Sequence, residues 1–312
     1  MKVVVAGGSG ALGRALCASL SRSGHDVVIL TRHLRDSPYR QRVWDGATLG
    51  PWMEELSGSA VVNLAGELVD RRPTRANIEL LTRSRVDPTR ALARAALEVA
   101  DPPKVWVQAS TLAIHGDAGE ELVTEDSAPG DGPPQMVGVA RAWEAAAADV
   151  RADRQVVLRT SIVLDRDTPA LRRLVGLVRY GLGGRVGSGQ QWFSWIHVDD
   201  WLRIVHWCLG LASSTPGAAD VSDSPPSGVV VATAPHPVRN SELMSTLRSV
   251  LHRPAAPPTP ELVVRLGSLV LRTDPALGLT GRRAVSARLD DAGFVFEHPR
   301  LREALEDLLR SG

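Results

Sequence analysis

The sequence predicts an α/β protein with a Rossmann-type doubly wound parallel sheet and a smaller C-terminal substrate lobe. The chain opens with a continuous apolar run, Val3 to Ala6, of the kind expected for a parallel strand covered on both faces. A glycine-rich turn, an amphipathic helix and a second apolar run, Val27 to Leu30, follow directly. Further strand-like runs alternate with helical patterns up to about residue 165. Alternation of this kind favours a parallel sheet with helices on both faces.

Composition and charge limit the class of partner. The 312 residues are 44% hydrophobic, which allows one large core or a core with a smaller lobe. Acidic and basic side chains nearly cancel, at 35 against 36, so no surplus field draws the protein to nucleic acid or to an anionic membrane. We therefore expect a small-molecule substrate, no nucleic acid, no membrane, and a monomer or homodimer.

Cysteine usage and the start of the chain predict a cytoplasmic protein. The only cysteines, Cys17 and Cys208, lie in apolar helical patterns, which indicates reduced core cysteines instead of a disulfide framework. The first strand begins at Lys2 and leaves no room for a signal peptide. No apolar run approaches the roughly 20 residues that a membrane span needs.

The glycine-rich turn predicts dinucleotide binding. Glycines at this spacing let the backbone turn tightly, approach a pyrophosphate and pack the helix on the sheet, while the helix N-terminus supplies backbone donors. A plain tight turn is the alternative, because the motif by itself is weak. The expected cofactor contacts in this turn are Gly7, Ser9, Gly10, Ala11, Leu12 and Gly13.

The end of the second strand predicts which dinucleotide is bound. A carboxylate about 20 residues beyond the glycines would bind the adenosine ribose of NAD, but this strand ends in Thr31 and Arg32. A guanidinium matches a phosphate with two hydrogen bonds, so Arg32, with Thr31, is expected to hold the 2′-phosphate of NADP(H). A solvated arginine is the alternative.

Two later segments add expected cofactor contacts. The buried strand in "SAVVNLAGE" ends at Leu64, Ala65 and Gly66, whose small size would let the adenosine lie against the backbone. A long helix with an interruption near Pro88 follows, and its Arg85 is expected beneath the cofactor. For Arg85, an ordinary charged helix face is the alternative.

Hydroxyl groups end the next strand, Val105 to Ala109. Sites in such sheets lie beyond the carboxyl ends of the strands, so Ser110 and Thr111 are expected at the reactive end of the cofactor, with Ser110 also contacting it. His115 is the titratable group near them, and an ordinary histidine pKa suits acid or base work. A loop histidine without a catalytic task is the alternative.

Further segments extend these motifs along the chain. In order they are "NLAGE", "SRVDPTR", "AS" ahead of "HG", "AWEAAA", "LRTSIVL", "GLGG", "GSGQQWFSWIHVDD" and "GFVFEHPRLREAL". This order resembles the extended short-chain dehydrogenase/reductases, and most of all an atypical subgroup known as epimerase family proteins or nucleoside-diphosphate-sugar epimerases. The resemblance covers almost the whole chain and is most specific in residues 183–200. It implies an oxidoreductase or epimerase-like enzyme.

The Tyr-x-x-x-Lys pair of that superfamily is missing. In the pair, lysine lowers the pKa of tyrosine so that the phenol can exchange a proton while hydride moves. By analogy its places fall on Met136 and Ala140 here, and neither side chain can relay a proton. The chain also departs from the subgroup at Ile114, His115 and Val231.

An aromatic cluster in residues 187–201 is expected to form one wall of the substrate-binding space. A metal site is not expected there, because no further histidine or cysteine lies at ligand spacing. Asp199 or Asp200 suits the N-cap of the following helix. Trp192 and Trp195 are expected to wall the substrate space, and His197 to order the loop. The expected substrate-side residues are Gln191, Trp192, Trp195 and His197.

The substrate lobe is expected to take two stretches of chain. The predicted Rossmann domain spans 1–165, with 190–210 and 228–234 returning to it, and the lobe takes 166–189 and 235–312. A Ser/Pro/Gly-rich loop is predicted over 211–227.

Two hypotheses for function remain from the sequence. In the first hypothesis, the protein is an NADP(H)-dependent oxidoreductase or epimerase-like enzyme that acts on a small carbonyl or hydroxyl compound. Alternatively it binds NADP(H) as a regulatory or redox-sensing protein, or as a non-redox enzyme that does not turn the cofactor over.

Overall fold

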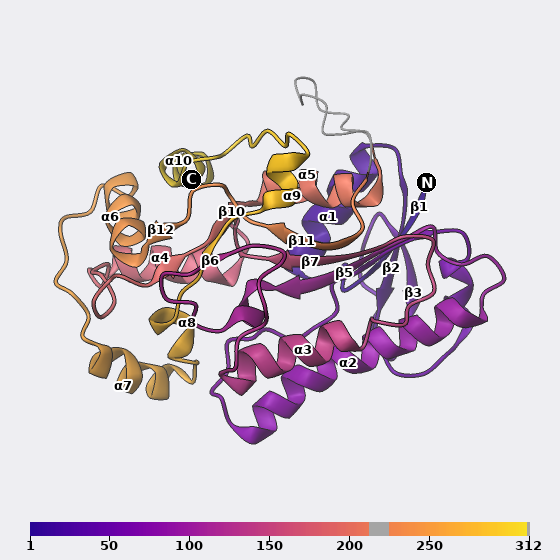
Figure 1. The fold of residues 1–312 in the computed structure, drawn as a ribbon, viewed down its shortest axis with the longest axis horizontal. Coiled ribbons are helices and arrows are strands. Elements are labelled where there is room, and N and C mark those ends of the chain that lie inside the picture. The colour runs from indigo at the N-terminus through magenta and orange to yellow at the C-terminus, as the bar shows by residue number, and fades with distance from the viewer. Residues whose placement is uncertain (212–224, 311–312) are drawn as a thin grey trace.

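A parallel sheet forms the centre of the computed structural model, which describes residues 1–211 and 225–310 (Figure 1). Most of the loop predicted over 211–227 therefore lies outside the described residues. The strands of this sheet are β1 (Lys2–Ala6), β2 (Asp26–Thr31), β3 (Arg40–Val43), β4 (Ala60–Asn63), β5 (Val105–Thr111), β7 (Gln155–Thr160) and β11 (Gly228–Ala232).

The strand order predicts a ligand-binding crevice beyond the carboxyl ends of the strands. The order is β11-β7-β5-β4-β1-β2-β3, and every neighbouring pair is parallel. The chain winds outward from β1 to β3 and then returns to β4 on the other side of β1. Ligands of such sheets bind beyond the carboxyl ends of the strands at this reversal. The predicted fold class is confirmed.

Helices cover both faces of the sheet, which explains the unbroken apolar runs. Val3 and Val5 join the core under α1 (Ala11–Arg22) and α5 (Val198–Leu209), while Val4 packs in the core under α2 (Arg75–Glu98). The short helix α3 (Val139–Ala145) lies beside α2, and α9 (Ala287–Asp291) lies near α5 (Figure 1). Strand residues that point to opposite faces are therefore both buried.

The predicted interruption at Pro88 is wrong. Helix α2 continues from Arg75 to Glu98 with Pro88 inside it. A proline costs one backbone hydrogen bond in a helix interior, but α2 has buried residues before Pro88 and, after it, apolar residues that join the core under the sheet. Tertiary packing therefore overrides the local preference.

A separate core lies beside the sheet. Helices α4 (Pro169–Arg179), α6 (Asn240–Val250) and α10 (Leu301–Arg310) enclose it, together with β8 (Ile162–Leu164) and β10 (Trp195–His197). The predicted lobe boundaries, at 1–165, 166–189, 190–210, 228–234 and 235–312, stay a prediction. The remaining elements are β6 (Leu122–Val123), β9 (Trp192–Phe193), β12 (Val238–Arg239), β13 (Arg283–Ala284), α7 (Glu261–Leu271), α8 (Ala276–Leu279) and the helical turns η1 (Pro51–Leu56), η2 (Leu112–His115) and η3 (Pro134–Gly138).

Both cysteines lie in the core, as predicted. Cys17 and Cys208 are free and buried, and burial raises the pKa of each thiol to about 12. Neither thiol is therefore ionised near neutral pH. Among the described residues, no helix combines the length and the apolar character needed to cross a membrane.

One buried histidine predicts a loss of stability in acid. His206 of α5 is 7% exposed, and its Nε2 lies 3.1 Å from the hydroxyl of Ser19. Burial, with smaller contributions from the neighbouring His25 and Arg22, lowers the pKa of His206 from 6.5 to about 4. The folded state therefore holds this imidazole neutral, whereas the unfolded chain protonates it as the pH falls below 6.5.

We expect the free energy of unfolding to fall by about 3 kcal/mol between pH 6.5 and pH 4 because of this group. The contribution is fully present above the unfolded pKa and is lost as pH drops toward the folded pKa. Urea unfolding across this range should show a smaller decrease for His206→Gln than for the wild type. His252→Asn removes an exposed histidine and should leave the decrease unchanged. An identical decrease in His206→Gln and wild type would contradict the prediction.

Candidate functional site

The glycine turn between β1 and α1 has no room for side chains. Gly7 has a φ of +82°, and a Cβ built on it would lie 2.7 Å from the backbone of Leu64. A Cβ on Gly13 would lie 2.3 Å from the carbonyl oxygen of Gly7. These contacts hold the start of α1 against the ends of β1 and β4. They leave a cradle of bare backbone, which a dinucleotide pyrophosphate can approach closely.

The start of α1 offers backbone donors. Gly10 is the N-cap and makes no side-chain cap, and the first turn holds no acidic residue. Ser9, Ala11 and Leu12 are half-buried in the same turn. The first N–H groups of a helix have no partner inside it, and its dipole favours an anion there. The residues predicted from the glycine pattern are therefore brought together at one helix N-terminus, although their contact with a cofactor stays a prediction.

Arg32 lies at the end of β2, beside the loop that follows β4. Its side chain is 69% exposed, and its Nη2 is 3.6 Å from a carboxylate oxygen of Glu67. Thr31 is buried and donates its hydroxyl to the carbonyl of His33. The guanidinium is therefore held at the rim of the crevice by an exposed ion pair that contributes little to stability. It remains available to a second anionic group.

Arg85 is buried and supports the loop after β4. It donates to the carbonyl oxygens of Glu67 at 2.8 Å and Leu81 at 3.1 Å, and a Cβ on Gly66 would lie 3.1 Å from its Cζ. Burial lowers the pKa of Arg85 to about 10, with Glu67 opposing the shift. An ordinary exposed helix face is excluded for Arg85. Its bonds fix the backbone of this loop, which includes the predicted contacts Leu64, Ala65 and Gly66.

Ser110 belongs to a polar network that the sequence did not predict. Its hydroxyl donates to the carboxylate of Glu144 on α3, and Arg159 on β7 donates to the same carboxylate through two bonds of 2.9 Å. Arg159 and Glu144 are 8% and 17% exposed in their side chains. Thr111 accepts the N–H of Ala113 through its hydroxyl oxygen. The network fixes Ser110 at the end of β5.

His115 is a buried imidazole with one open nitrogen. Its Nδ1 lies 3.0 Å from the carbonyl oxygen of Ala128, which can only accept, so Nδ1 carries the proton. Its Nε2 is buried and has no hydrogen-bond partner in the part of the chain that the structure describes. Burial lowers the pKa of His115, with smaller contributions from Arg159 and Arg282. The ring is therefore neutral at pH 7, and Nε2 presents a lone pair.

A half-buried arginine, Arg282, contacts the position where the missing catalytic pair would be. Met136 and Ala140 are both buried, and Arg282 donates through Nη2 to the sulfur of Met136 at 3.4 Å. The Nε of Arg282 is buried without a partner. Burial lowers its pKa to about 10, opposed by Asp117. Sequence reasoning missed Arg282, because it is more than 140 residues from Met136 and no local motif marks it.

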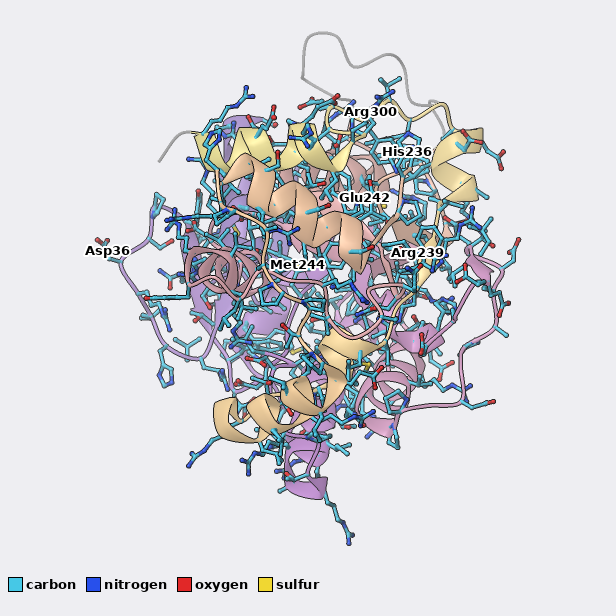
Figure 2. All side chains as sticks on the ribbon, turned by 90° about the vertical axis from the view of Figure 1, so that its left-hand side faces the viewer. Asp36, His236, Arg239, Glu242, Met244 and Arg300 are labelled. Atoms are coloured by element: carbon cyan, nitrogen blue, oxygen red, sulfur yellow. The ribbon has the colours of Figure 1, made fainter. Side chains whose placement is uncertain are left out.

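A cavity of about 230 Å³ lies on the substrate side, and Gln191 and Trp192 line it. Trp192 donates to the carboxylate of Glu120, and Arg239 lies over its ring at 3.8 Å. Arg239, at the end of β12, is labelled in Figure 2 and also pairs with Glu120 at 2.7 Å. Asp117, Glu120 and Glu261 give this cavity an acidic side.

The prediction that Trp195 walls the substrate space is wrong. Trp195 is fully buried in the core around α4, α6 and α10, and it donates its indole N–H to the carbonyl of His236. Successive side chains of a strand point to opposite faces, and that of Trp195 in β10 points toward the core instead of the substrate space. Trp192 is in β9 and remains half-exposed.

The N-cap of α5 is His197, so the prediction of Asp199 or Asp200 is wrong. The Nδ1 of His197 accepts the N–H of Asp199 at 3.1 Å. Asp200 is instead fully buried, and its carboxylate accepts the backbone N–H groups of Glu297 and His298 at 2.8 and 2.9 Å. His197 therefore orders the start of α5, which agrees with its expected role.

Ligand spacing along one segment did not predict a metal site at His197 and Asp199. His298 and Asp307 join these residues to form a group with metal-ligating side chains. They lie about 100 residues further along the chain, so ligand spacing within one segment could not reveal them.

Comparison with known proteins identifies the family. Residues 3–141 match the NAD dependent epimerase/dehydratase family, and residues 259–308 match a domain of unknown function, DUF1731. The chain is 34% identical to the mouse epimerase family protein SDR39U1, over 99% of this chain and 100% of the relative. It is 30% identical to YfhF, an epimerase family protein of Bacillus subtilis, over 99% of this chain and 98% of that one.

A crystal structure of human SDR39U1 with NADPH has the same fold. Its TM-score is 0.85 at 31% sequence identity, and the match covers all of both chains. The resemblance that the motif order predicted is thus confirmed. The chain belongs to the epimerase family proteins, an atypical group of extended short-chain dehydrogenase/reductases with a nucleotide-binding Rossmann fold.

Proposed function

We propose that this protein binds NADP(H) at the carboxyl ends of β1, β2 and β4 and acts as an oxidoreductase or epimerase-like enzyme on a small carbonyl or hydroxyl compound. The main support for this proposal is the turn at Gly7 and Gly13, which has no room for side chains and has Arg32 at its rim. The NADPH in the human relative supports the same choice of cofactor.

Arg32 discriminates between NADP(H) and NAD(H) in this proposal. Its guanidinium is exposed at the end of β2, where the adenosine ribose lies in folds of this type. Glu67 holds it in place at 3.6 Å without using all of its donors. A 2′-phosphate would accept two parallel hydrogen bonds from it, whereas the 2′-hydroxyl of NAD(H) would meet a cation with no matching charge.

Ser110, Thr111 and His115 are the groups we assign to the chemistry. Bound NADP(H) would supply or accept the hydride. Thr111 uses its hydroxyl oxygen as an acceptor for Ala113, so its hydroxyl proton can be donated to a substrate carbonyl. Ser110 donates to Glu144 and presents its remaining lone pair to a substrate hydroxyl. His115 would take the hydroxyl proton at Nε2, the nitrogen that has no partner.

Arg282 indicates which chemical group of the substrate would lie beside it. Its partnerless Nε and its contact with Met136 place an incompletely paired cation where the tyrosine of related enzymes would stand. Buried charges are normally paired, so a substrate carbonyl oxygen or an anionic group is the partner we propose. The cavity beside Trp192 would hold the rest of a small substrate.

Cofactor titration tests this proposal. We expect NADPH to bind at least about tenfold more tightly than NADH, because a charge-assisted hydrogen bond contributes about 1.5–3 kcal/mol. Arg32→Ala should remove that preference and leave NADH binding nearly unchanged, measured by fluorescence titration. Arg35→Ala, which removes another arginine of the same loop, is the matched control and should retain it. Equal affinities of the wild type for both cofactors would exclude this assignment.

The second candidate is a protein that binds NADP(H) without turning it over. Met136 and Ala140 favour it, since neither exchanges a proton at the places of the Tyr/Lys pair. A screen of carbonyl compounds and nucleotide sugars separates the two candidates. Substrate-dependent loss of NADPH absorbance supports the enzyme. Tight NADPH binding with no change of absorbance for any compound supports the regulatory or non-redox function.

A further inference from the structure

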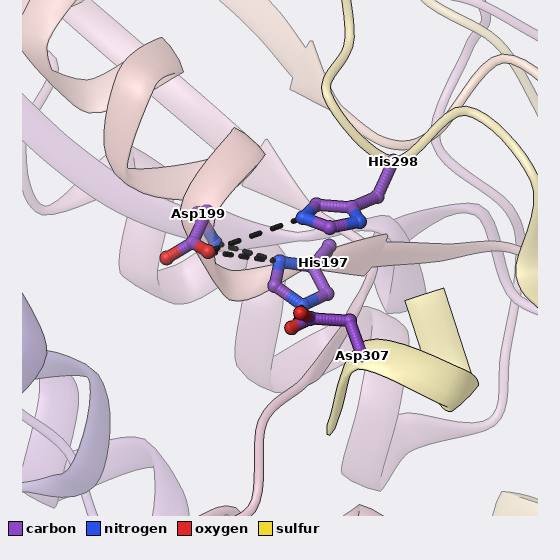
Figure 3. A group of neighbouring side chains, drawn as sticks. All are labelled: His197, Asp199, His298 and Asp307. Atoms are coloured by element: carbon purple, nitrogen blue, oxygen red, sulfur yellow. Dashed lines mark hydrogen bonds and ion pairs between the residues drawn. The ribbon is translucent and has the colours of Figure 1, made fainter. Parts of the chain in front are cut away.

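Four metal-ligating side chains meet at the start of α5. His197, Asp199, His298 and Asp307 each offer one ligand atom, and these atoms all lie within 4.8 Å of one another. Figure 3 shows Asp199 beside the two imidazole rings, with Asp307 close to the ring of His197. The residues come from β10, the first turn of α5, the segment before α10, and α10 itself.

The two imidazoles are held in place by the fold. His197 is 1% exposed and its Nδ1 caps α5. His298 is fixed through its backbone, because the buried carboxylate of Asp200 accepts its N–H at 2.9 Å. The ring centroids are 3.8 Å apart. The ligand side chains are therefore already close together before a metal ion binds, so ordering them costs little conformational entropy.

The surroundings of the His197 Nε2 atom indicate that it binds a ligand. It is buried and has no hydrogen-bond partner among residues 1–211 and 225–310, and a carboxylate oxygen of Asp307 lies 3.3 Å from it. Two ligands at zinc bond lengths of about 2.0–2.1 Å in a tetrahedral site are separated by about 3.3 Å. The nitrogen and the oxygen thus have the spacing of two ligands of one ion, in a geometry that does not satisfy a hydrogen bond between them.

We propose that this cluster binds a divalent transition-metal ion of the zinc type. His197 Nε2, His298 and Asp307 are the ligands, and Asp199 orients His197. Metal binding moves the proton of His197 from Nε2 to Nδ1, which lies 3.6 Å from the carboxylate of Asp199. The imidazole stays neutral throughout, and the N–H of Asp199 is left to water at the helix terminus.

The chemistry of the ligand set and its surroundings agree with this ion. Imidazole with carboxylate suits zinc and its neighbours in the first transition series, whereas calcium and magnesium prefer oxygen alone. Asp199 and Asp307 are 53% and 54% exposed in their side chains, which gives the ion an entry path and leaves a coordination position to water.

Bound metal would connect distant parts of the chain. His197 and Asp199 stand at the start of α5, which packs on the central sheet, whereas Asp307 belongs to α10 of the separate core. An ion held by both would resist their separation. We therefore expect metal to raise the thermal stability of the protein, because only the folded state gathers the ligands.

The test is a Co²⁺ titration of the full chain, purified without a histidine tag and treated with a chelator. We expect visible d–d absorption of tetrahedral intensity that saturates at one Co²⁺ per chain and is abolished by Zn²⁺. His298→Ala and Asp307→Asn should weaken Co²⁺ binding at least about tenfold. His197→Asn should do the same while retaining an N-cap for α5, since asparagine caps helices well.

Matched controls remove the same chemical groups nearby. His236→Ala takes away an exposed histidine, labelled in Figure 2, and Glu303→Gln an exposed carboxylate of α10. Both should bind Co²⁺ like the wild type. Zn²⁺ should raise the Tm of the wild type and of both controls but not of His298→Ala. Absence of d–d bands at saturating Co²⁺, or bands that survive in both His298→Ala and Asp307→Asn, would overturn the proposal.

Discussion

Gly13→Ala is expected to weaken NADPH binding by roughly a hundredfold and to destabilise the protein by about 3 kcal/mol. The added Cβ would lie 2.3 Å from the carbonyl oxygen of Gly7 and 2.6 Å from the Cα of Gly8. Both contacts are with backbone, which cannot rotate away as a side chain can. The turn must therefore open, and its N–H groups leave the positions that a pyrophosphate would use.

Urea unfolding and NADPH titration together check the effect of Gly13→Ala. Gly176→Ala is the matched control, because Gly176 also lies within a helix and an added Cβ there meets nothing within 4 Å. It should leave NADPH binding unchanged and stabilise the protein by up to about 1 kcal/mol, the helix preference of alanine over glycine. Wild-type NADPH affinity in Gly13→Ala would show that the cradle is not the cofactor site.

Arg159→Met is expected to destabilise the protein by about 3 kcal/mol. The substitution leaves the carboxylate of Glu144, 17% exposed, without the two 2.9 Å bonds that now satisfy it. An uncompensated buried charge costs more than the ion pair itself contributes, because desolvation of the carboxylate is no longer offset. The free energy of unfolding from urea denaturation measures the loss.

The double variant Glu144→Met/Arg159→Met separates the unpaired charge from lost packing. It should recover much of the stability that Arg159→Met loses, since two apolar side chains replace the pair. Additive losses in the double variant would contradict this account. The Ser110 hydroxyl also loses its acceptor in the double variant, so catalytic turnover, where it can be measured, should fall even though the fold is restored.

Patterns within one segment of chain predicted the central fold correctly. The apolar runs at Val3–Ala6 and Val27–Leu30 are strands covered on both faces, and their positions in the sheet follow from the alternation of strand and helix. The glycines between them have the close backbone contacts that their spacing implied. Such features depend on neighbours in sequence, so periodicity and spacing reveal them.

Predictions failed where tertiary packing competes with a local preference. Pro88 was expected to interrupt a helix, yet α2 continues through it because residues on both sides are buried and those after it pack in the core under the sheet. Trp195 was expected beside the substrate, but its position in β10 turns it into the separate core. His197, not an aspartate, caps α5, because the local backbone brings its Nδ1 to the N–H of Asp199. Amino-acid composition does not determine which way such side chains point in the fold.

The fold class, the glycine cradle and the arginine at the end of β2 could be predicted from the amino-acid sequence, because each is encoded in a few consecutive residues. Which polar side chains share a site depends on how distant segments pack together. The pairing of Glu144 with Arg159, the contact of Arg282 with Met136, and the approach of His298 to His197 all join separate segments. Their energies depend on distance and burial in the folded state, and no spacing along the chain records either quantity.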